Sequence, residues 1–310
     1  MIPEKPFSPA DFRQVNLQER DLFEPMLIHS RERSCEFSFS NLYVWSPVYQ
    51  NQWQIWNNRV YLYGGREDRL MFTSDAERKD DPSAEELHAV SEAMRSTGSS
   101  GIFTQVRKEY IDEHPELEKF FEIKQLDPSF AEYIYSVQEL AELKGKKLSK
   151  KRNLIAQFCH AQPDCEVRPI TSANIQDCIE LSRLWRSMQD DPDSETIVFE
   201  AKATAHLADH YDDLHMEGVG AYFQGRLIAY ALVNRIQETI WTEPFEKALP
   251  GCKGAAQFIN HELAKYLYPR VQFLNREQDL GDAGLRHAKM SYAPTELLCN
   301  YELTPRDKTI

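Results

Sequence analysis

The chain has 310 residues, more than a single hydrophobic core usually serves, and we expect two domains. Its 49 acidic residues outnumber the 36 basic ones, and the net charge of −13 excludes a surface that binds nucleic acid over its whole extent. No run approaches the roughly 20 apolar residues of a membrane-spanning helix, and the N-terminus lacks the pattern of a secretory signal. We therefore expect a cytoplasmic protein without a transmembrane segment, whose oligomeric state the sequence leaves open.

The N-terminal half alternates short strands with helices. Asn57 and Asn58 separate two aromatic runs, which predicts a β-hairpin, and Ser83 is placed to cap a helix. The expected elements are a helix at 21–30, strands at 52–56, 59–63 and 70–73, a helix at 84–95, a strand at 101–106, a helix at 116–121 and a strand at 131–136.

The C-terminal half shows the same kind of alternation more clearly. A strand is expected at 165–170, followed by a helix that begins after Thr171 and Ser172 and ends at about 188, and by a second helix at 196–214. The elements expected after these are strands at 218–223, 226–233 and 238–243, a helix at 255–267, a strand at 271–275, a helix at 284–290 and a strand at 296–303. This order is the layout of the GNAT-type acyltransferase fold. We therefore expect the fold class α/β (α+β): two tandem GNAT-like domains with mixed, partly antiparallel sheets, at 1–140 and 141–310, the second carrying the site.

A strongly basic segment lies at the expected domain junction. Residues 144–152 hold six cations, and the candidates for binding a phosphate-bearing ligand are Lys146, Lys147, Lys150, Lys151 and Arg152. Such a ligand would be CoA, the acceptor end of a tRNA or an anionic lipid headgroup. The alternative is the solvated start of a charged helix.

Small residues mark the start of the helix expected at 255–267. Gly251, Gly254 and Ala255 lie where free backbone amides of a helix N-terminus are able to hold a phosphate. A connection from a strand to a helix also needs small residues, so this alternative carries about equal weight.

The segment 275–292 concentrates charged groups directly after a strand. Arg276 or Arg286 would contact an anion, with Asn275 in the binding set, and Glu277 or Asp279 would act as a base or an orienting carboxylate. Tyr292 would protonate a leaving group. The alternative is an ion-pair network that stabilises the domain. We expect no metal site, because the cysteines and histidines lack the usual spacings of metal ligands.

Four segments carry a resemblance to a known family. They are Phe39-Ser-Asn-Leu-Tyr-Val-Trp45, the basic run from Leu143 to Asn153, Glu246-Lys-Ala248 with Gly254, and the stretch from Asn275 to Pro294. Over residues 8–304 the chain resembles an uncharacterised bacterial family similar to the C-terminal domain of phosphatidylglycerol lysyltransferase. The resemblance implies tandem GNAT-like domains, as in lipid aminoacyltransferases and Fem-type transferases, which use aminoacyl-tRNA. The transmembrane flippase portion of the full-length lysyltransferase is not in this sequence.

Two functions follow as hypotheses. The first is an acyl- or aminoacyltransferase that uses acyl-CoA or aminoacyl-tRNA as donor and an amine or hydroxyl as acceptor. The second is a non-catalytic GNAT-like module that binds a nucleotide, acyl-CoA or an anionic lipid. The sequence specifies neither donor nor acceptor.

Overall fold

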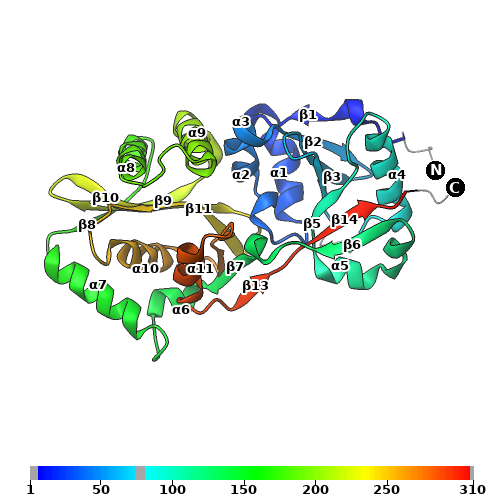
Figure 1. The fold of residues 1–310 in the computed structure, drawn as a ribbon. Helices are drawn as coiled ribbons and strands as arrows, with labels where there is room; N and C mark the ends of the chain where they lie inside the picture. Colours follow the sequence, from blue (N-terminus) through cyan, green and yellow to red (C-terminus); the bar gives the residue numbers. More distant parts are fainter. Residues whose placement is uncertain (1–5, 75–80, 308–310) are drawn as a thin grey trace. The chain divides into compact units, whose positions relative to one another are not determined.

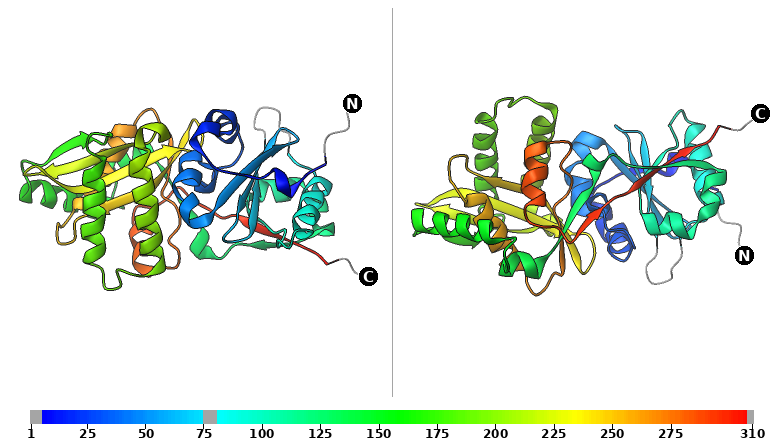
Figure 2. Two further views of the ribbon diagram at one scale, coloured as in Figure 1. Left: turned by 90° about the horizontal axis from the view of Figure 1, so that it is seen from above. Right: turned by 60° about the horizontal axis from the view of Figure 1, so that its bottom comes forward.

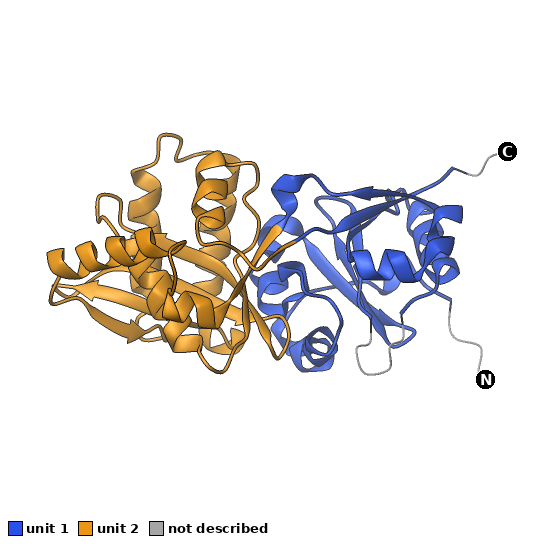
Figure 3. Ribbon diagram, turned by 90° about the horizontal axis from the view of Figure 1, so that it is seen from below, with its two compact units in different colours: residues 1–131, 298–310 blue, residues 132–297 orange. Residues whose placement is uncertain are grey.

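The computed structural model describes residues 6–74 and 81–307. The chain forms two compact units, with residues 1–131 and 298–310 in unit 1 and residues 132–297 in unit 2 (Figure 3). Compared with the expected division at 140, the strand at 132–136 lies in unit 2, and the end of the chain returns to unit 1. None of the described helices is long and apolar enough to cross a membrane.

Unit 1 is built on a mixed sheet. In the order of the sheet its strands are β1 (Arg13–Gln14), β2 (Asn51–Trp56), β3 (Arg59–Gly64), β4 (Arg69–Phe72), β5 (Phe103–Val106), β14 (Tyr301–Pro305) and β6 (Phe121–Gln125). The pair β4–β5 is parallel, and the other neighbouring strands of this sheet pair antiparallel. The β2–β3 hairpin forms as expected, because Asn57 and Asn58 adopt the positive φ values of 48° and 57° that a tight turn requires.

Helices cover both faces of this sheet (Figure 1). They are α1 (Arg20–Ile28), α2 (Phe39–Val44), α3 (Ser46–Tyr49), α4 (Ala84–Arg95) and α5 (Lys108–Glu113). Phe23 of α1 stacks on Trp53 with ring centroids 4.1 Å apart. On the other face α4 begins where Ser83 accepts a hydrogen bond from the backbone of Glu86, as its sequence predicts.

Unit 2 is built on a second mixed sheet. Its strands in order are β13 (Glu296–Leu298), β7 (Glu132–Ser136), β12 (Phe273–Asn275), β11 (Ile240–Ala248), β10 (Arg226–Arg235), β9 (Glu217–Phe223) and β8 (Glu166–Pro169). The strands β8 to β11 form an antiparallel meander, and β11 and β12 are parallel. Strand β7, which follows unit 1 in the sequence, pairs with β12.

Six helices are described in unit 2. They are α6 (Val137–Glu142), α7 (Ser149–Ala161), α8 (Ile175–Ser187), α9 (Glu195–Asp209), α10 (Ala255–Leu267) and α11 (Ala283–Met290). Helices α8 and α9 lie side by side on one face of the sheet, and α10 lies on the other with α7 against it (Figures 1 and 2). Ile259, Leu263 and Leu267 of α10 form a core with small residues of β9 and β10.

Several expected elements differ from the structure. The helix expected at 116–121 is a 3-10 helix at Pro115–Lys119, and the strand β6 follows it from Phe121. The strand expected at 238–243 continues to Ala248, and the helix expected up to residue 214 ends at Asp209, before a short 3-10 turn. The strand expected at 296–303 is two strands: β13 belongs to the sheet of unit 2 and β14 to that of unit 1. The two units nevertheless share one arrangement, in which an antiparallel meander leads to a parallel pair joined by a helix: β4–α4–β5 and β11–α10–β12.

Candidate functional site

The parallel pair of unit 2 separates at one end. The pairing of β11 with β12 stops at Thr242 and Asn275, where β12 ends, while β11 runs on to Ala248. Glu243 and Glu246 therefore lie on the part of β11 that no longer pairs with β12, and Arg276 is the first residue after β12. The strand ending at Asn275 thus lies beside the one leading toward Glu246.

The side chain of Arg276 joins the two separated strands. Its Nε lies 2.6 Å from Glu243 and its Nη2 donates a hydrogen bond to Glu246. The guanidinium also lies 5.2 Å from the ring of Tyr292 and 5.8 Å from that of Tyr135. Arg276 is only 9% exposed; burial lowers its pKa, but the two carboxylates more than offset this and raise it above its ordinary value.

Glu243 is a member of the site that the sequence did not lead us to expect. Glu243 is buried, and burial raises the pKa of its carboxyl group, although the positive charge of Arg276 opposes the rise. The register of β10 with β11 is irregular at this point, where Pro244 has no N–H to donate to the ladder. The expected strand ended at Glu243 because Pro244 follows, so nothing in the local pattern indicated that the strand continues past Glu243 to Glu246.

Lys151 and Tyr292 meet across this cluster from distant parts of the chain. The Lys151 ammonium lies 3.9 Å from the centre of the Tyr292 ring, and Lys151 is 8% exposed. Burial, together with the nearby Arg276, lowers the pKa of Lys151 to about 8. Within the described part of the chain, the buried hydroxyl of Tyr292 has no hydrogen-bond partner.

The other basic residues of the 144–152 segment have different surroundings. Lys146, Lys147 and Lys150 are exposed. Arg152 donates hydrogen bonds to the carbonyl oxygens of Leu143 and Gly145, and so holds the turn between α6 and α7. The structure thus divides the predicted basic patch into three exposed lysines, an inward lysine and an arginine that fixes a turn.

Asp279 and Arg286 form a compact network beside the cluster. The carboxylate of Asp279 accepts two hydrogen bonds of 2.9 Å from Arg286, one of 2.6 Å from Tyr133 and one of 2.9 Å from the Gly281 amide. Chiefly through the bonds from Arg286, the pKa of Asp279 falls to about 2. A carboxylate so fully bonded orients its neighbours but is a weak base.

Asn275, Glu277 and Lys289 hold the loop that follows β12. Asn275 accepts a hydrogen bond from the Glu277 amide, and Thr242 donates one to the Glu277 carboxylate at 2.9 Å. Lys289 is buried, and its ammonium donates to the carbonyl oxygens of Arg276 and Gln278 at 2.6 and 2.5 Å. These bonds fix the backbone that presents Arg276.

The glycine-bearing loop before α10 is packed against α7. A Cβ atom on Gly254 would lie 2.4 Å from the carbonyl oxygen of Leu154, so the close approach of α7 requires glycine here. Ala255 is fully buried and Gly251 is exposed. The packing of α7 against this loop therefore explains why residue 254 is glycine, without a role in binding phosphate.

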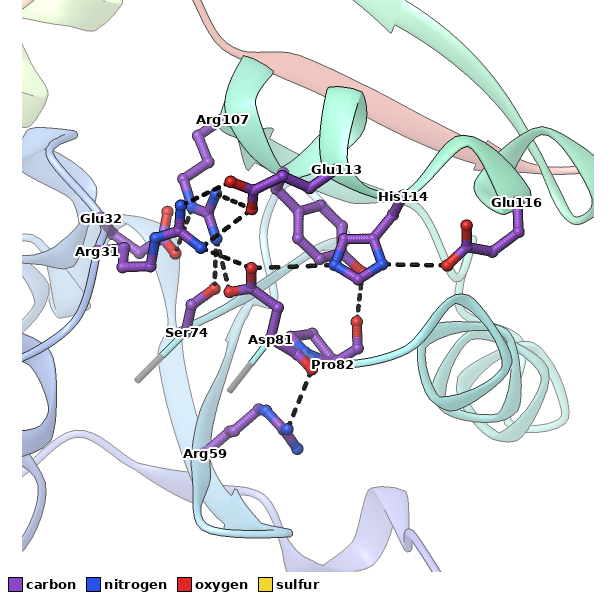
Figure 4. Close-up of polar contacts among 11 residues, drawn as sticks. Arg31, Glu32, Arg59, Ser74, Asp81, Pro82, Arg107, Glu113, His114 and Glu116 are labelled. Carbon is purple, nitrogen blue, oxygen red and sulfur yellow. Dashed lines mark hydrogen bonds and ion pairs between the residues drawn. The ribbon is translucent and has the colours of Figure 1, made fainter. Parts of the chain in front are cut away.

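Unit 1 contains a second buried arginine with carboxylates around it (Figure 4). Arg107 contacts Asp81 at 2.6 Å, Ser74 at 3.0 Å and Glu32 at 3.5 Å. Arg31 bridges Asp81 and Glu113 at the edge of this cluster. Burial raises the pKa of Glu32 to about 7. Over the residues described, no group of three or more His, Cys, Asp or Glu side chains is placed to hold a metal ion.

Comparisons with known proteins agree with this fold. A Bacteroides thetaiotaomicron protein of unknown function is 28% identical, with a TM-score of 0.88 over 97% of this chain and 100% of its own. The structure named L-PGS from Bacillus licheniformis is 12% identical, with a TM-score of 0.64 over 100% of this chain and 95% of its own. An uncharacterised Mycoplasmoides gallisepticum protein is 21% identical over 58% of each chain, so the match spans little more than half of that relative.

Both units have the GNAT-like arrangement of a mixed sheet with a parallel pair joined by a helix. The model of one family matches residues 29–302, which is most of the chain. The chain belongs to that family, described as phosphatidylglycerol lysyltransferase, C-terminal.

Proposed function

We propose that unit 2 transfers an acyl or aminoacyl group from acyl-CoA or aminoacyl-tRNA to an amine or hydroxyl acceptor. The family and the GNAT-like fold support acyl transfer in general. The observation that carries the proposal is the Tyr292 hydroxyl, which is buried and has no hydrogen-bond partner among the described residues, on a ring that the Lys151 ammonium contacts. A buried polar group without a partner costs about 1–3 kcal/mol, so this hydroxyl favours a ligand as its partner.

The acceptor would attack the carbonyl carbon of the donor. A new bond forms between its nitrogen or oxygen and that carbon, and the carbonyl oxygen gains negative charge in the tetrahedral intermediate. Glu243 would accept the proton that the acceptor loses, because burial raises the pKa of this carboxyl group toward the range of a useful base. Asp279 is the weaker candidate, since its pKa is about 2.

Collapse of the intermediate breaks the bond to the leaving group. Tyr292 would donate a proton to the leaving oxygen or sulfur, and burial raises the pKa of this phenol so that it stays protonated at neutral pH. The Lys151 ammonium, held over the Tyr292 ring, would stabilise the negative charge of the intermediate. Arg276 would keep Glu243 and Glu246 in place.

The donor would bind where its phosphates meet exposed cations. Lys146 and Lys147 lie just before α7, and Lys150 lies in its first turn. The residue after Lys150 is Lys151, whose side chain points inward to the cluster. A phosphate-bearing carrier held there would have its acyl end near the cluster. Such donors imply a cytoplasmic location, and an anionic lipid headgroup is one acceptor among the classes to test.

The Tyr292→Phe variant tests the chemistry directly. Since the hydroxyl bonds to no described residue, its removal leaves the fold intact, and a purely structural tyrosine predicts unchanged turnover. We expect transfer from labelled aminoacyl-tRNA or acyl-CoA to fall about 10²–10⁴-fold with an unchanged melting temperature. Transfer at the wild-type rate would contradict the role of Tyr292. Donor binding by the wild type without transfer to amine, hydroxyl or lipid acceptors would favour the non-catalytic module instead.

The exposed lysines are tested by charge reversal. Lys146→Glu, Lys147→Glu and Lys150→Glu together should weaken donor binding more than tenfold and reduce its salt dependence, because each phosphate contact contributes to the salt slope. The matched control reverses three exposed lysines on β6, α9 and α10, at Lys124, Lys202 and Lys265. Equal losses in the two variants would show a general charge effect and no donor site at α7.

A further inference from the structure

A pocket lies on the opposite face of the unit 2 sheet from the Arg276 cluster. In the register of β10 with β11, Lys247 is opposite Tyr230, whereas Glu246 is opposite Ala231. Tyr230 is hydrogen-bonded to Ser182 of α8, and Ala231 belongs to the core beneath α10, so neighbouring residues of β11 serve the two faces. The pocket lies between α8, α9 and Lys247, with a volume of about 130 Å³.

The walls of the pocket are mostly apolar. Ile179 of α8 and Ile197, Ala201 and Ala205 of α9 line it together with the Trp185 ring. Its volume suits a body about the size of a benzene ring or a branched aliphatic group. The shape therefore favours a small ligand with an apolar part.

The polar part of the pocket combines three cationic side chains, of Lys247, Arg183 and Arg186, with Glu200, Ser182 and Thr204. The Lys247 ammonium lies 2.5 Å from Glu200 and 4.4 Å from the centre of the Trp185 ring, and its side chain is only 12% exposed. Glu200 is its one hydrogen-bonding or ion-pair partner among the described residues, which leaves N–H groups of a nearly buried ammonium available. Arg183 also lines the pocket and bonds to no described residue, while Arg186 is already held by Pro192 and Asp193.

We propose that this pocket binds a small carboxylic acid with a compact apolar body. The carboxylate would accept hydrogen bonds from Lys247 and Arg183, and the apolar body would lie between Ile179, Ile197 and the Trp185 ring. The proposal is independent of the acyl-transfer reaction, since it concerns the other face of the sheet and binding alone.

Ligand-observed NMR titrations of the full chain test the proposal with 3-methylbutanoate as the probe. We expect saturable binding, at least tenfold weaker binding of the neutral 3-methylbutanamide, and weaker binding of acetate, which lacks the apolar body. Ala201→Leu fills the pocket without changing charge and should abolish binding. Arg183→Gln removes an exposed cation that no described residue needs and should weaken binding about threefold or more.

Four outcomes would overturn the proposal: no saturable binding of 3-methylbutanoate, equal binding of the amide, undiminished binding by Ala201→Leu, or displacement of the probe by inorganic phosphate as effectively as by the acid itself. The last would show a site for any anion. Melting temperatures of both variants, which we expect near that of the wild type, show that a loss of binding is not a loss of fold.

Discussion

Arg107 in unit 1 and Arg276 in unit 2 occupy the same place in the two folds. Each is the first residue after the second strand of the parallel pair, each is buried, and each is bound by carboxylates. The carboxylates around Arg107 come from three separate segments, at Glu32, Asp81 and Glu113. Those around Arg276 come from one strand, β11, which leaves its other side to aromatic rings.

The difference between the two clusters lies in what surrounds the arginine. Unit 2 adds the Lys151 ammonium, which forms no ion pair with a described carboxylate, and the Tyr292 hydroxyl, which bonds to no described residue. In unit 1 the second cation, Arg31, is paired with Asp81 and Glu113. The same position in the fold therefore holds an ion-pair network in one unit, and in the other a network with groups left available. This contrast supports the placement of the proposed chemistry in unit 2.

Removal of either arginine should have the largest effect. Arg276→Met leaves the buried carboxylate of Glu243 and the partly exposed one of Glu246 without their cation, and we expect unit 2 to lose about 3–5 kcal/mol of its free energy of unfolding. Arg107→Met should cost unit 1 a similar amount. Urea unfolding followed by hydrogen exchange assigns each loss to its unit. Adding Glu243→Gln and Glu246→Gln to Arg276→Met should recover most of the loss. If one of the two variants loses less than about 1 kcal/mol of unfolding free energy, the two arginines do not play equivalent structural roles.

Lys151→Met should stabilise unit 2 while it abolishes transfer. At pH 7 the buried ammonium is charged in both states, and its desolvation destabilises the folded one, so the variant gains about 2 kcal/mol. Folded Lys151 loses its proton near pH 8 and the unfolded one near its ordinary value of 10.5, so the gain should fade over that interval. Urea unfolding between pH 7 and 10.5 measures it. The control is Lys150→Met, at the exposed neighbouring lysine. If the stability gained by Lys151→Met does not depend on pH, desolvation of the ammonium is not its cause.

Glu32→Gln should produce an effect of similar size with the opposite dependence on pH. Burial raises the pKa of Glu32 from 4.5 to about 7, so the folded state favours the protonated form. The wild type therefore loses stability as the pH rises from 4.5 to 7, and the variant should gain about 3 kcal/mol relative to it over that interval. The exposed Glu109→Gln is the control. If the relative stability of Glu32→Gln does not change with pH, the pKa of Glu32 is the same in the folded and the unfolded state.

Local pattern predicted most elements, and the exceptions have physical reasons. The β2–β3 hairpin and α10 follow from turn residues and helical periodicity. The inward position of Lys151 was readable in principle, since it precedes Ile155 and Phe158 by four and seven residues on one helical face. The continuation of β11 beyond Pro244, which brings Glu243 and Glu246 together at Arg276, was not predicted because proline usually ends a strand. The partner of β14 is not encoded locally, because a strand pattern does not specify which distant strand it joins.

The position of β14 has a consequence for synthesis on the ribosome. In unit 1 this strand lies between β5 and β6 and pairs with both, yet it follows the whole of unit 2 in the sequence. As the chain emerges, all segments of unit 2 are available before the sheet of unit 1 receives β14. Unit 1 is made first but completed last, which reverses the usual order in which the N-terminal domain folds before the next. Until then, the edges of β5 and β6 that β14 later covers are open to pairing with other chains.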